Sequence, residues 1–239
     1  MLEAILHNIM KFYNPVKNTF VTQKFGENKA CQNVDGKVIG STNGICPLGF
    51  DPMYKKMGMD GHNGFDFITW SGQPIYHSFD FKGWIRTEVD TAGGMGIDII
   101  STEPLLKCPI CGQKHYLKAR YWHNKRNEFE GERLATFKWV TKYKDLIVGL
   151  GDKIALSDNT GLSSGDHLHF GLKWCDKEGN GIHSNNGYYG AIDINDMHEN
   201  IFVGDVVEIK EVQMNIIELA KEVVFLLKVF IKRLSINNK

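Results

Sequence analysis

Short alternations of apolar and polar residues, separated by glycine-rich turns, run through most of this chain. Side chains on one face of a strand recur at every second position, and stretches of this kind lie at residues 74–77, 96–100, 115–123, 153–156 and 168–174. Turn-like strings such as Ala92-Gly93-Gly94 separate them. Many short strands joined by glycine turns predict a mainly β fold built on an antiparallel sheet or sandwich.

The pattern changes near residue 205, where apolar residues begin to recur at helical spacing. We therefore divide the chain into a β domain at residues 1–205 and an added C-terminal amphipathic helix at residues 206–239. The helix lacks the roughly 20 uncharged apolar residues of a membrane span. We expect it to dock on the domain or on a partner chain; self-association and binding to a membrane surface are the alternatives. Its apolar positions are Ile216, Ile217, Leu219, Ala220, Val223, Val224, Leu226, Leu227, Phe230 and Ile231.

Composition narrows the class of protein. The chain has 239 residues, of which 42% are hydrophobic and 23% charged, enough for one core-forming domain with an appendage. Its net charge is zero, so it lacks the electrostatic footprint of a nucleic-acid-binding protein. The N-terminus shows no basic start, long apolar run or cleavage site of a signal peptide.

Two short motifs about a hundred residues apart carry the candidate chemistry. The first holds His62 and Asp66, and the second holds His167 and His169. Together they offer two imidazoles and a carboxylate for a metal, with a further imidazole beside it. Three protein ligands and an open position for water are the inventory of a catalytic zinc site.

The spacing within each motif has a geometric meaning. Residues two apart on a strand share a face, so His167 and His169 lie side by side. On a straight strand His62 and Asp66 would be roughly 13 Å apart, too far for one ion. Asn63-Gly64 is a strong turn signal, and a bend there brings the imidazole back onto the carboxylate. From spacing alone, either of the two later histidines could be the metal ligand.

The chain resembles the M23 peptidases, the lysostaphin- and LytM-type zinc endopeptidases of bacterial cell walls. Besides the two motifs, the resemblance extends over roughly residues 15 to 175, through the segments 21–26, 72–76, 119–123, 151–155 and 158–165. It implies the family's antiparallel β fold, known as the duplicated hybrid motif. Asp166 stands where the family usually has proline, and Gly171 where a glutamate often follows.

Carried over position by position, the resemblance implies that His62, Asp66 and His169 bind one catalytic Zn²⁺. It implies catalytic roles for His123 and His167 beside the metal. The chain has no His-Glu-x-x-His string, so histidines would have to move the protons. Without the resemblance, a half-buried structural role would be the better interpretation of His123.

The resemblance implies a metalloendopeptidase that cleaves stem or cross-bridge peptides of peptidoglycan. We expect such an enzyme to lyse or remodel the bacterial cell wall, as a virion component or after release by a route without a signal peptide. The alternative is a catalytically silent wall-binding or regulatory module on the same fold. A third interpretation, an unrelated β protein with a structural zinc, is disfavoured because the motifs leave an open coordination position.

Two cysteine-containing stretches look inserted into the family core. Residues 27–60 hold Cys31 and Cys46, and residues 102–114 hold Cys108 and Cys111 in the form of a zinc knuckle. The four thiols could converge on a second, structural zinc. Alternatively, Cys31 and Cys46 form a disulfide beside an independent C-x-x-C pair. The remaining histidines, which include His115 and His183, lie in no motif, and we expect them to be solvated or packed.

Overall fold

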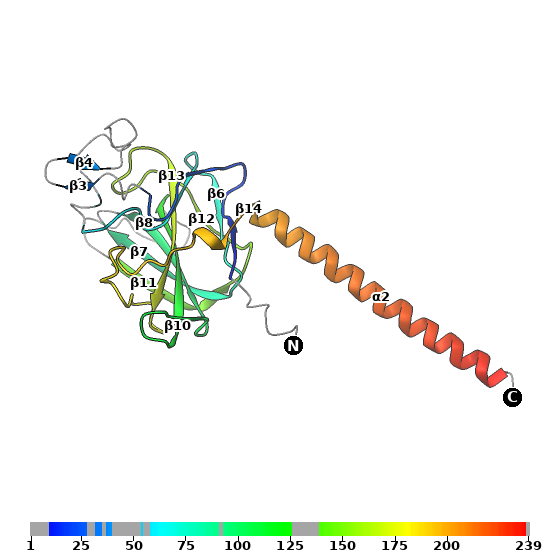
Figure 1. Cartoon of the computed structure of the whole chain (residues 1–239). Helices are drawn as coiled ribbons and strands as arrows, with labels where there is room; N and C mark the ends of the chain where they lie inside the picture. Colours follow the sequence, from blue (N-terminus) through cyan, green and yellow to red (C-terminus); the bar gives the residue numbers. More distant parts are fainter. Residues whose placement is uncertain are drawn as a thin grey trace.

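One large antiparallel sheet organises the computed structural model (Figure 1). The structure describes residues 10–27, 32–34, 37–39, 54, 58–90, 93–125 and 139–237. In spatial order the sheet contains β11 (Trp139–Val148), β7 (Gly83–Asp90), β8 (Gly94–Ser101), β10 (Lys114–Asn124), β13 (His167–Cys175), β5 (Phe65–Ile68) and β2 (Val21–Gln23). The short β9 (Leu106–Lys107) pairs with the beginning of β10.

Smaller elements cover one face of this sheet. Strand β6 (Pro74–Tyr76) pairs with β12 (Lys153–Leu156), and β1 (Phe12–Asn14) pairs in parallel with β14 (His198–Phe202). A short 3-10 turn, η1 (Asn195–Met197), precedes β14. A separate hairpin consists of β3 (Gln32–Val34) and β4 (Lys37–Ile39).

The hydrophobic core lies between the large sheet and these smaller elements. The ring centroid of Phe12 in β1 is 5.3 Å from that of Phe65 in β5 and 4.9 Å from that of Phe170 in β13. All three rings are fully buried, and each such burial stabilises the fold by about 2 kcal/mol. The alternation predicted from sequence therefore has a physical cause, because every second residue of these strands faces this core.

The opposite face of the sheet is polar and carries the candidate site. Alternate residues of β5 and β13 that point away from the core include Asp66, His167 and His169. Further along the same face, β8 and β10 contribute a buried ionic group in which Arg120 Nε donates to Asp98 Oδ1 at 2.9 Å. The candidate site and the hydrophobic core thus lie on opposite faces of one sheet.

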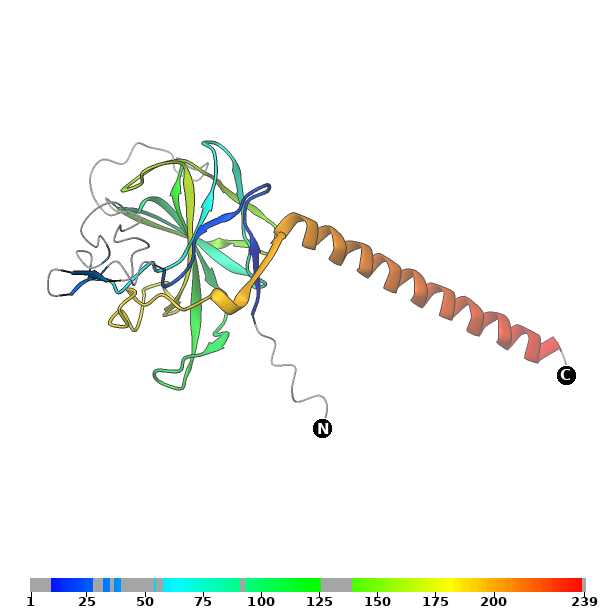
Figure 2. The ribbon, with the colours of Figure 1, turned by 45° about the horizontal axis from the view of Figure 1, so that its top comes forward.

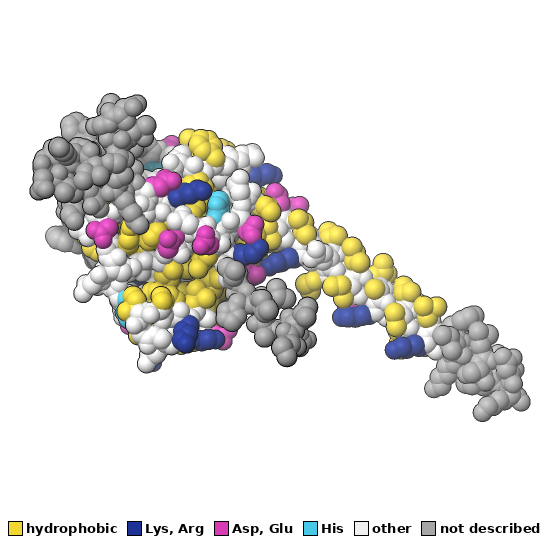
Figure 3. Space-filling view, viewed as in Figure 1, with side chains coloured by type: hydrophobic (Ala, Val, Ile, Leu, Met, Phe, Trp, Pro, Cys, Tyr) yellow, Lys and Arg dark blue, Asp and Glu magenta, His cyan; other side chains and the backbone are white. Residues whose placement is uncertain are grey.

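The C-terminal helix α2 (Val203–Asn237) projects away from the domain in both ribbon views (Figures 1 and 2). Its first turns hold it: Val203 is buried, Val207 packs on Gly151, and Lys210 Nζ lies 3.1 Å from Asp80 Oδ2. Between Ile209 and Leu227, eleven large apolar side chains are 49% to 70% exposed, and many are visible along the helix in Figure 3. In the helix as far as it is described, no segment is long and apolar enough to cross a membrane.

The structure confirms the mainly antiparallel β fold with an added C-terminal helix. All five expected strands are present, and the described residues include further strands that the alternation did not identify, among them β7 and β11 of the large sheet. Only the beginning of the helix docks on the domain, and binding of its remaining length to a partner chain, a second copy or a membrane surface stays a prediction. An apolar stripe indicates that one face of a helix packs against another surface, but it does not specify which surface.

We expect the β domain to fold without most of α2. A chain ending at Glu211 keeps Val203, Val207 and Lys210, and the side chains that it loses between residues 212 and 228 are exposed. Its melting temperature, measured by circular dichroism, should therefore stay within a few degrees of that of the full chain. Loss of the cooperative transition would show that the distal helix is part of the domain's core.

A buried histidine makes the stability of this domain depend on pH. His77 is fully buried, its Nε2 donates to Phe81 O at 2.9 Å, and its Nδ1 accepts from the Tyr121 hydroxyl at 2.9 Å. Burial lowers the pKa of His77 to about 4. The His77 imidazole is therefore protonated near pH 6.5 in the unfolded chain but only near pH 4 in the folded chain.

Acidification from pH 6.5 to pH 4 should accordingly destabilise the wild type by about 3 kcal/mol through His77. In His77→Gln this part of the pH dependence should be absent, whatever the variant's stability at pH 7. Urea unfolding of both proteins at pH 7, 5.5 and 4 measures the difference, with each protein's value at pH 7 as its own reference. Equal losses in both proteins would contradict the assignment.

Candidate functional site

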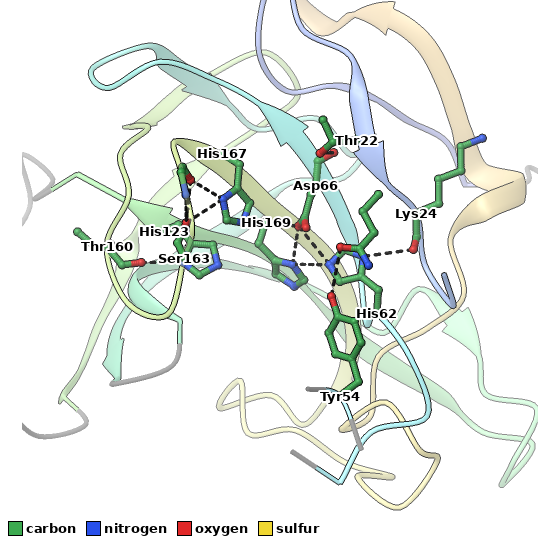
Figure 4. Close-up of polar contacts among 12 residues, drawn as sticks. Thr22, Lys24, Tyr54, His62, Asp66, His123, Thr160, Ser163, His167 and His169 are labelled. Atoms are coloured by element: carbon green, nitrogen blue, oxygen red, sulfur yellow. Dashed lines mark hydrogen bonds and ion pairs between the residues drawn. The ribbon is translucent and has the colours of Figure 1, made fainter. Parts of the chain in front are cut away.

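Three potential ligand atoms converge where β5 lies beside β13. Asp66 in β5 is paired directly with His169 in β13, so both side chains leave the same face. His62 precedes β5, and the chain bends at Gly64 between them. Figure 4 shows the result: Asp66 Oδ1 lies 3.0 Å from His169 Nδ1 and 3.1 Å from His62 Nε2, and the two nitrogens are 3.0 Å apart.

Gly64 makes this convergence possible. A Cβ atom at that position would lie 2.4 Å from Phe170 O and 2.9 Å from His169 Cε1, closer than atoms can approach. The chain can therefore pass over His169 only if residue 64 has no side chain. The Asn-Gly pair in the first motif thus serves a close approach as well as a bend.

The three atoms fit a small divalent cation. His62 Nδ1 lies 3.2 Å from Lys24 O, and donating a proton there leaves Nε2 with a lone pair. Two nitrogen lone pairs and a carboxylate oxygen that point at one spot repel one another unless a cation lies between them. The ligand atoms of a tetrahedral zinc with bonds of about 2.0–2.1 Å are roughly 3.3 Å apart, close to the separations observed. Side-chain exposures of 14% for Asp66 and 19% for His169 leave one side of the group open.

The electrostatics of the group agree with this assignment. Burial by itself raises the pKa of the Asp66 carboxyl, but the neighbouring His62 and His169 rings outweigh it and hold the pKa below its usual range. Burial lowers the pKa of His169 to about 4. At neutral pH the group therefore offers an ionised carboxylate and a neutral imidazole, the protonation states that a metal requires.

Two more histidines lie beside the three ligands. The His123 and His167 ring centroids are 4.5 Å apart, and His167 Nε2 is 3.9 Å from Asp66 Oδ1. His167 Nδ1 contacts Gly165 O at 2.8 Å, and His123 Nδ1 contacts Thr160 O at 2.7 Å. Because a carbonyl can only accept, Nδ1 of each ring carries the proton that it donates.

An irregularity in β10 aims His123. The pairing of β10 with β8 shifts between Tyr121 and Asn124, and His123 adopts a left-handed φ of 64°. A non-glycine residue in this region is unusual and costs of order 1 kcal/mol or more. The surrounding contacts hold it there: its N–H donates to Gly93 O at 3.1 Å.

Other residues at the site were not identified from sequence. Tyr54 places its ring 5.9 Å from that of His62, and its hydroxyl is 3.2 Å from Gln23 Oε1. Burial and then the Asp66 charge raise the pKa of Tyr54, which keeps the phenol neutral. No motif near Tyr54 indicates this position. Asp166 accepts a hydrogen bond from Ser71 N–H at 3.0 Å, which explains an acidic residue beside His167.

The structure thus brings together the three proposed metal ligands and both proposed catalytic histidines. The structure describes two of the four cysteines of the proposed second site. Cys108 and Cys111 lie near His115 and His183, two histidines to which the sequence analysis assigned no ligand role. Cys31 and Cys46 lie outside the described residues, so the proposed disulfide and four-cysteine site remain predictions.

Comparison with known proteins found a likeness among solved structures. No protein-family model and no curated protein matches the chain. A zinc-containing peptidase from Vibrio cholerae is 20% identical with a TM-score of 0.45, over 80% of this chain and 40% of that one. The catalytic domain of lysostaphin from Staphylococcus simulans is 22% identical with a TM-score of 0.34, over 56% of this chain and 77% of that one.

A third solved structure, the catalytic domain of the prophage-encoded M23 protein EnpA from Enterococcus faecalis, is 20% identical with a TM-score of 0.34. It matches over 51% of this chain and 75% of that one. The printed name of this third protein includes M23, and the other two are named as peptidases. The chain spans about two fifths of the length of the Vibrio cholerae peptidase.

Metal binding at this site should depend on Asp66. Replacing a ligand costs at least as much as replacing its supporting partners, so Asp66→Asn should weaken zinc binding about 100-fold or more. Competition with a chromogenic chelator measures the affinity. Asp166→Asn is the matched control, because its carboxylate lies near the site but bonds to Ser71 N–H. Equal weakening in both variants would argue against Asp66 as a ligand.

Proposed function

We propose that the chain is a zinc-dependent endopeptidase that hydrolyses peptide bonds in the stem or cross-bridge peptides of peptidoglycan. The observation that carries this proposal is the pair His123 and His167 beside an open three-ligand centre. Each ring is oriented by a backbone carbonyl that contacts its Nδ1, so Nε2 is the ring atom through which it would exchange a proton. A purely structural metal site would need a fourth protein ligand and would have no use for two oriented bases.

The chain's own residues divide the chemistry between them. His62, Asp66 and His169 would hold the zinc, which when bound acidifies a water molecule and polarises a carbonyl. One of His123 and His167 takes a proton from the attacking water at Nε2. A protonated histidine then donates to the departing amine, and a histidine N–H can also stabilise negative charge on the carbonyl oxygen.

The choice of peptidoglycan as substrate rests on the sequence motifs. The first motif, the second motif and the segments between them follow the order found in cell-wall endopeptidases. On this proposal the protein acts at the bacterial cell wall, in lysis or remodelling. The exposed stripe of α2 would then bind a partner protein, a second copy or a membrane surface, and would decide where the enzyme acts.

Digestion of purified muropeptides by the full chain tests the proposal. Mass spectrometry should detect products that have gained one water and carry a new amine terminus, and a chelator should abolish them. Intact muropeptides after incubation with zinc-loaded protein would support a silent binding module instead. Binding to the insoluble wall, measured by sedimentation, would then be the remaining activity.

The two auxiliary histidines should affect rate rather than metal content. In His123→Ala and His167→Ala, kcat should fall by on the order of 10² to 10⁴ because each change removes a proton-transfer group. Zinc stoichiometry should remain that of the wild type, as measured by mass spectrometry of the metal.

A graded variant serves as the control for this prediction. Ser163 Oγ lies 3.0 Å from His167 Nδ1, which also contacts Gly165 O. Ser163→Ala therefore leaves the ring one acceptor and should lower kcat far less than His167→Ala. If His167→Ala lost its zinc while His169→Ala retained it, the roles assigned to these two histidines would be reversed.

A further inference from the structure

A second group of metal-binding side chains lies at the far end of β10. Cys108 and Cys111 belong to the turn between β9 and β10, His115 lies at the beginning of β10, and His183 lies in the segment after β13. One ligand atom of each residue lies within 4.8 Å of those of the other three. We propose that these four residues form a second, structural zinc site, which fastens the segment after β13 to the β9–β10 hairpin.

The turn that carries the cysteines is shaped for a metal. Ile110 N–H donates to Cys108 Sγ at 3.4 Å, and Gly112 N–H donates to Cys108 O at 2.8 Å. Gly112 adopts a φ of 72°, which a glycine reaches without strain. This closed turn brings both sulfur atoms to one side, as a zinc knuckle requires.

The two histidines complete the group from separate parts of the chain. His115 Nε2 lies 2.9 Å from Cys111 Sγ, and the ring centroids of His115 and His183 are 5.6 Å apart. His183 Nε2 is buried and has no hydrogen-bond partner among the described residues. A buried polar atom without a partner costs free energy, and coordination to a cation would satisfy this one.

A set of two thiolates and two imidazoles favours zinc in a structural role. A tetrahedral set of two sulfur and two nitrogen ligands is typical of zinc, and the two thiolate charges balance the charge of the ion. Ligand atoms of such a site lie roughly 3.3 to 3.8 Å apart, so shifts of about 1 Å would close the group on an ion. Four protein ligands leave no open position, in contrast to the centre at His62, Asp66 and His169.

The two centres are far apart. His115 and His123 lie eight residues apart on the same strand, which corresponds to about 26 Å. A metal at the cysteine site therefore cannot share ligands with the catalytic group. Its contribution to the enzyme would be structural.

The segment that the second site would hold covers buried positive charge. Lys118 and Lys173 are directly paired across β10 and β13, and both are buried. Their ammonium groups donate to backbone carbonyls of the covering segment: Lys118 Nζ to Gly179 O at 3.0 Å and Lys173 Nζ to Tyr189 O at 2.8 Å. Arg86 also donates to Gly179 O. The covering segment must stay in place for these buried cationic groups to keep their hydrogen bonds.

The same segment continues to the catalytic group. Asp60 N–H donates to Gly187 O at 2.8 Å, and Asp60 is two residues before His62. Anchoring the segment at His183 would therefore also steady the approach to the first metal ligand. The second zinc would act as a positioning device for both the ionic group and the catalytic centre.

Metal analysis of the full chain tests the proposal. The wild type should bind two zinc ions, and its cobalt form should show thiolate-to-metal charge-transfer absorption in the near ultraviolet. The centre at Asp66 has no sulfur ligand, so Asp66→Asn should lose one metal and keep this absorption. The readout is thus independent of peptide hydrolysis, and failure of the proposed function would leave it unchanged.

Two substitutions and one control complete the design. Cys111→Ser alters an exposed residue, and His183→Asn introduces a residue that tolerates the left-handed φ of 56° at that position. Both should bind one metal, lose or weaken the charge-transfer absorption, and be cleaved faster by protease within residues 176–190. Cys175→Ser is the control, because Cys175 is a buried free cysteine outside the group, and it should retain both metals.

Several outcomes would overturn the proposal. One metal per wild-type chain without thiolate charge transfer would do so, as would equal metal content in all the cysteine and histidine variants. A Cys108–Cys111 disulfide in the wild-type protein purified with zinc, detected by thiol titration and mass spectrometry, would show a redox pair instead.

Discussion

The register of β5 against β13 is the constraint on which the rest of this protein depends. Asp66 and His169 meet because they are directly paired, while Phe65 and Phe170 point to the opposite face and enter the core. A slip by one residue would turn Asp66 into the core and expose the phenylalanines. The burial of aromatic rings therefore determines where the carboxylate and the imidazole lie. Stability and metal binding are specified by the same alternation.

Backbone carbonyls orient three of the histidine rings at the candidate site. Lys24 O, Thr160 O and Gly165 O each contact the Nδ1 atom of a histidine; Lys24 follows β2, whereas Thr160 and Gly165 lie in the loop between β12 and β13. These contacts prepare His62 to bind a cation and His123 and His167 to exchange protons. The chemistry proposed for the site needs both, because a metal without oriented bases would bind substrate and leave proton transfer to solvent.

Strands β10 and β13 carry a potential metal centre at each end, and the covered ionic group lies between them. At one end the ligands leave an open side, and at the other they close around the metal position. The segment after β13 connects the two, since it contributes His183, solvates Lys118 and Lys173, and supports Asp60 near His62. One sheet thus carries both the open candidate site and the contacts of the segment that supports it. The helix α2 lies outside this arrangement beyond its first turns.

The sequence by itself determined the antiparallel β class, the amphipathic C-terminal helix and five residues that the structure brings to one site. Alternation is local, and the spacing of His62 to Asp66 and of His167 to His169 constrains geometry within a few residues. Tertiary structure decided what depends on distant segments meeting. His183 joins Cys108, Tyr54 approaches His62, and Asp98 is buried with Arg120, although nothing in their sequence neighbourhoods indicates it. The helix shows the same division, because its apolar stripe follows from local sequence, whereas the exposure of that stripe beyond the first turns is a property of the tertiary structure.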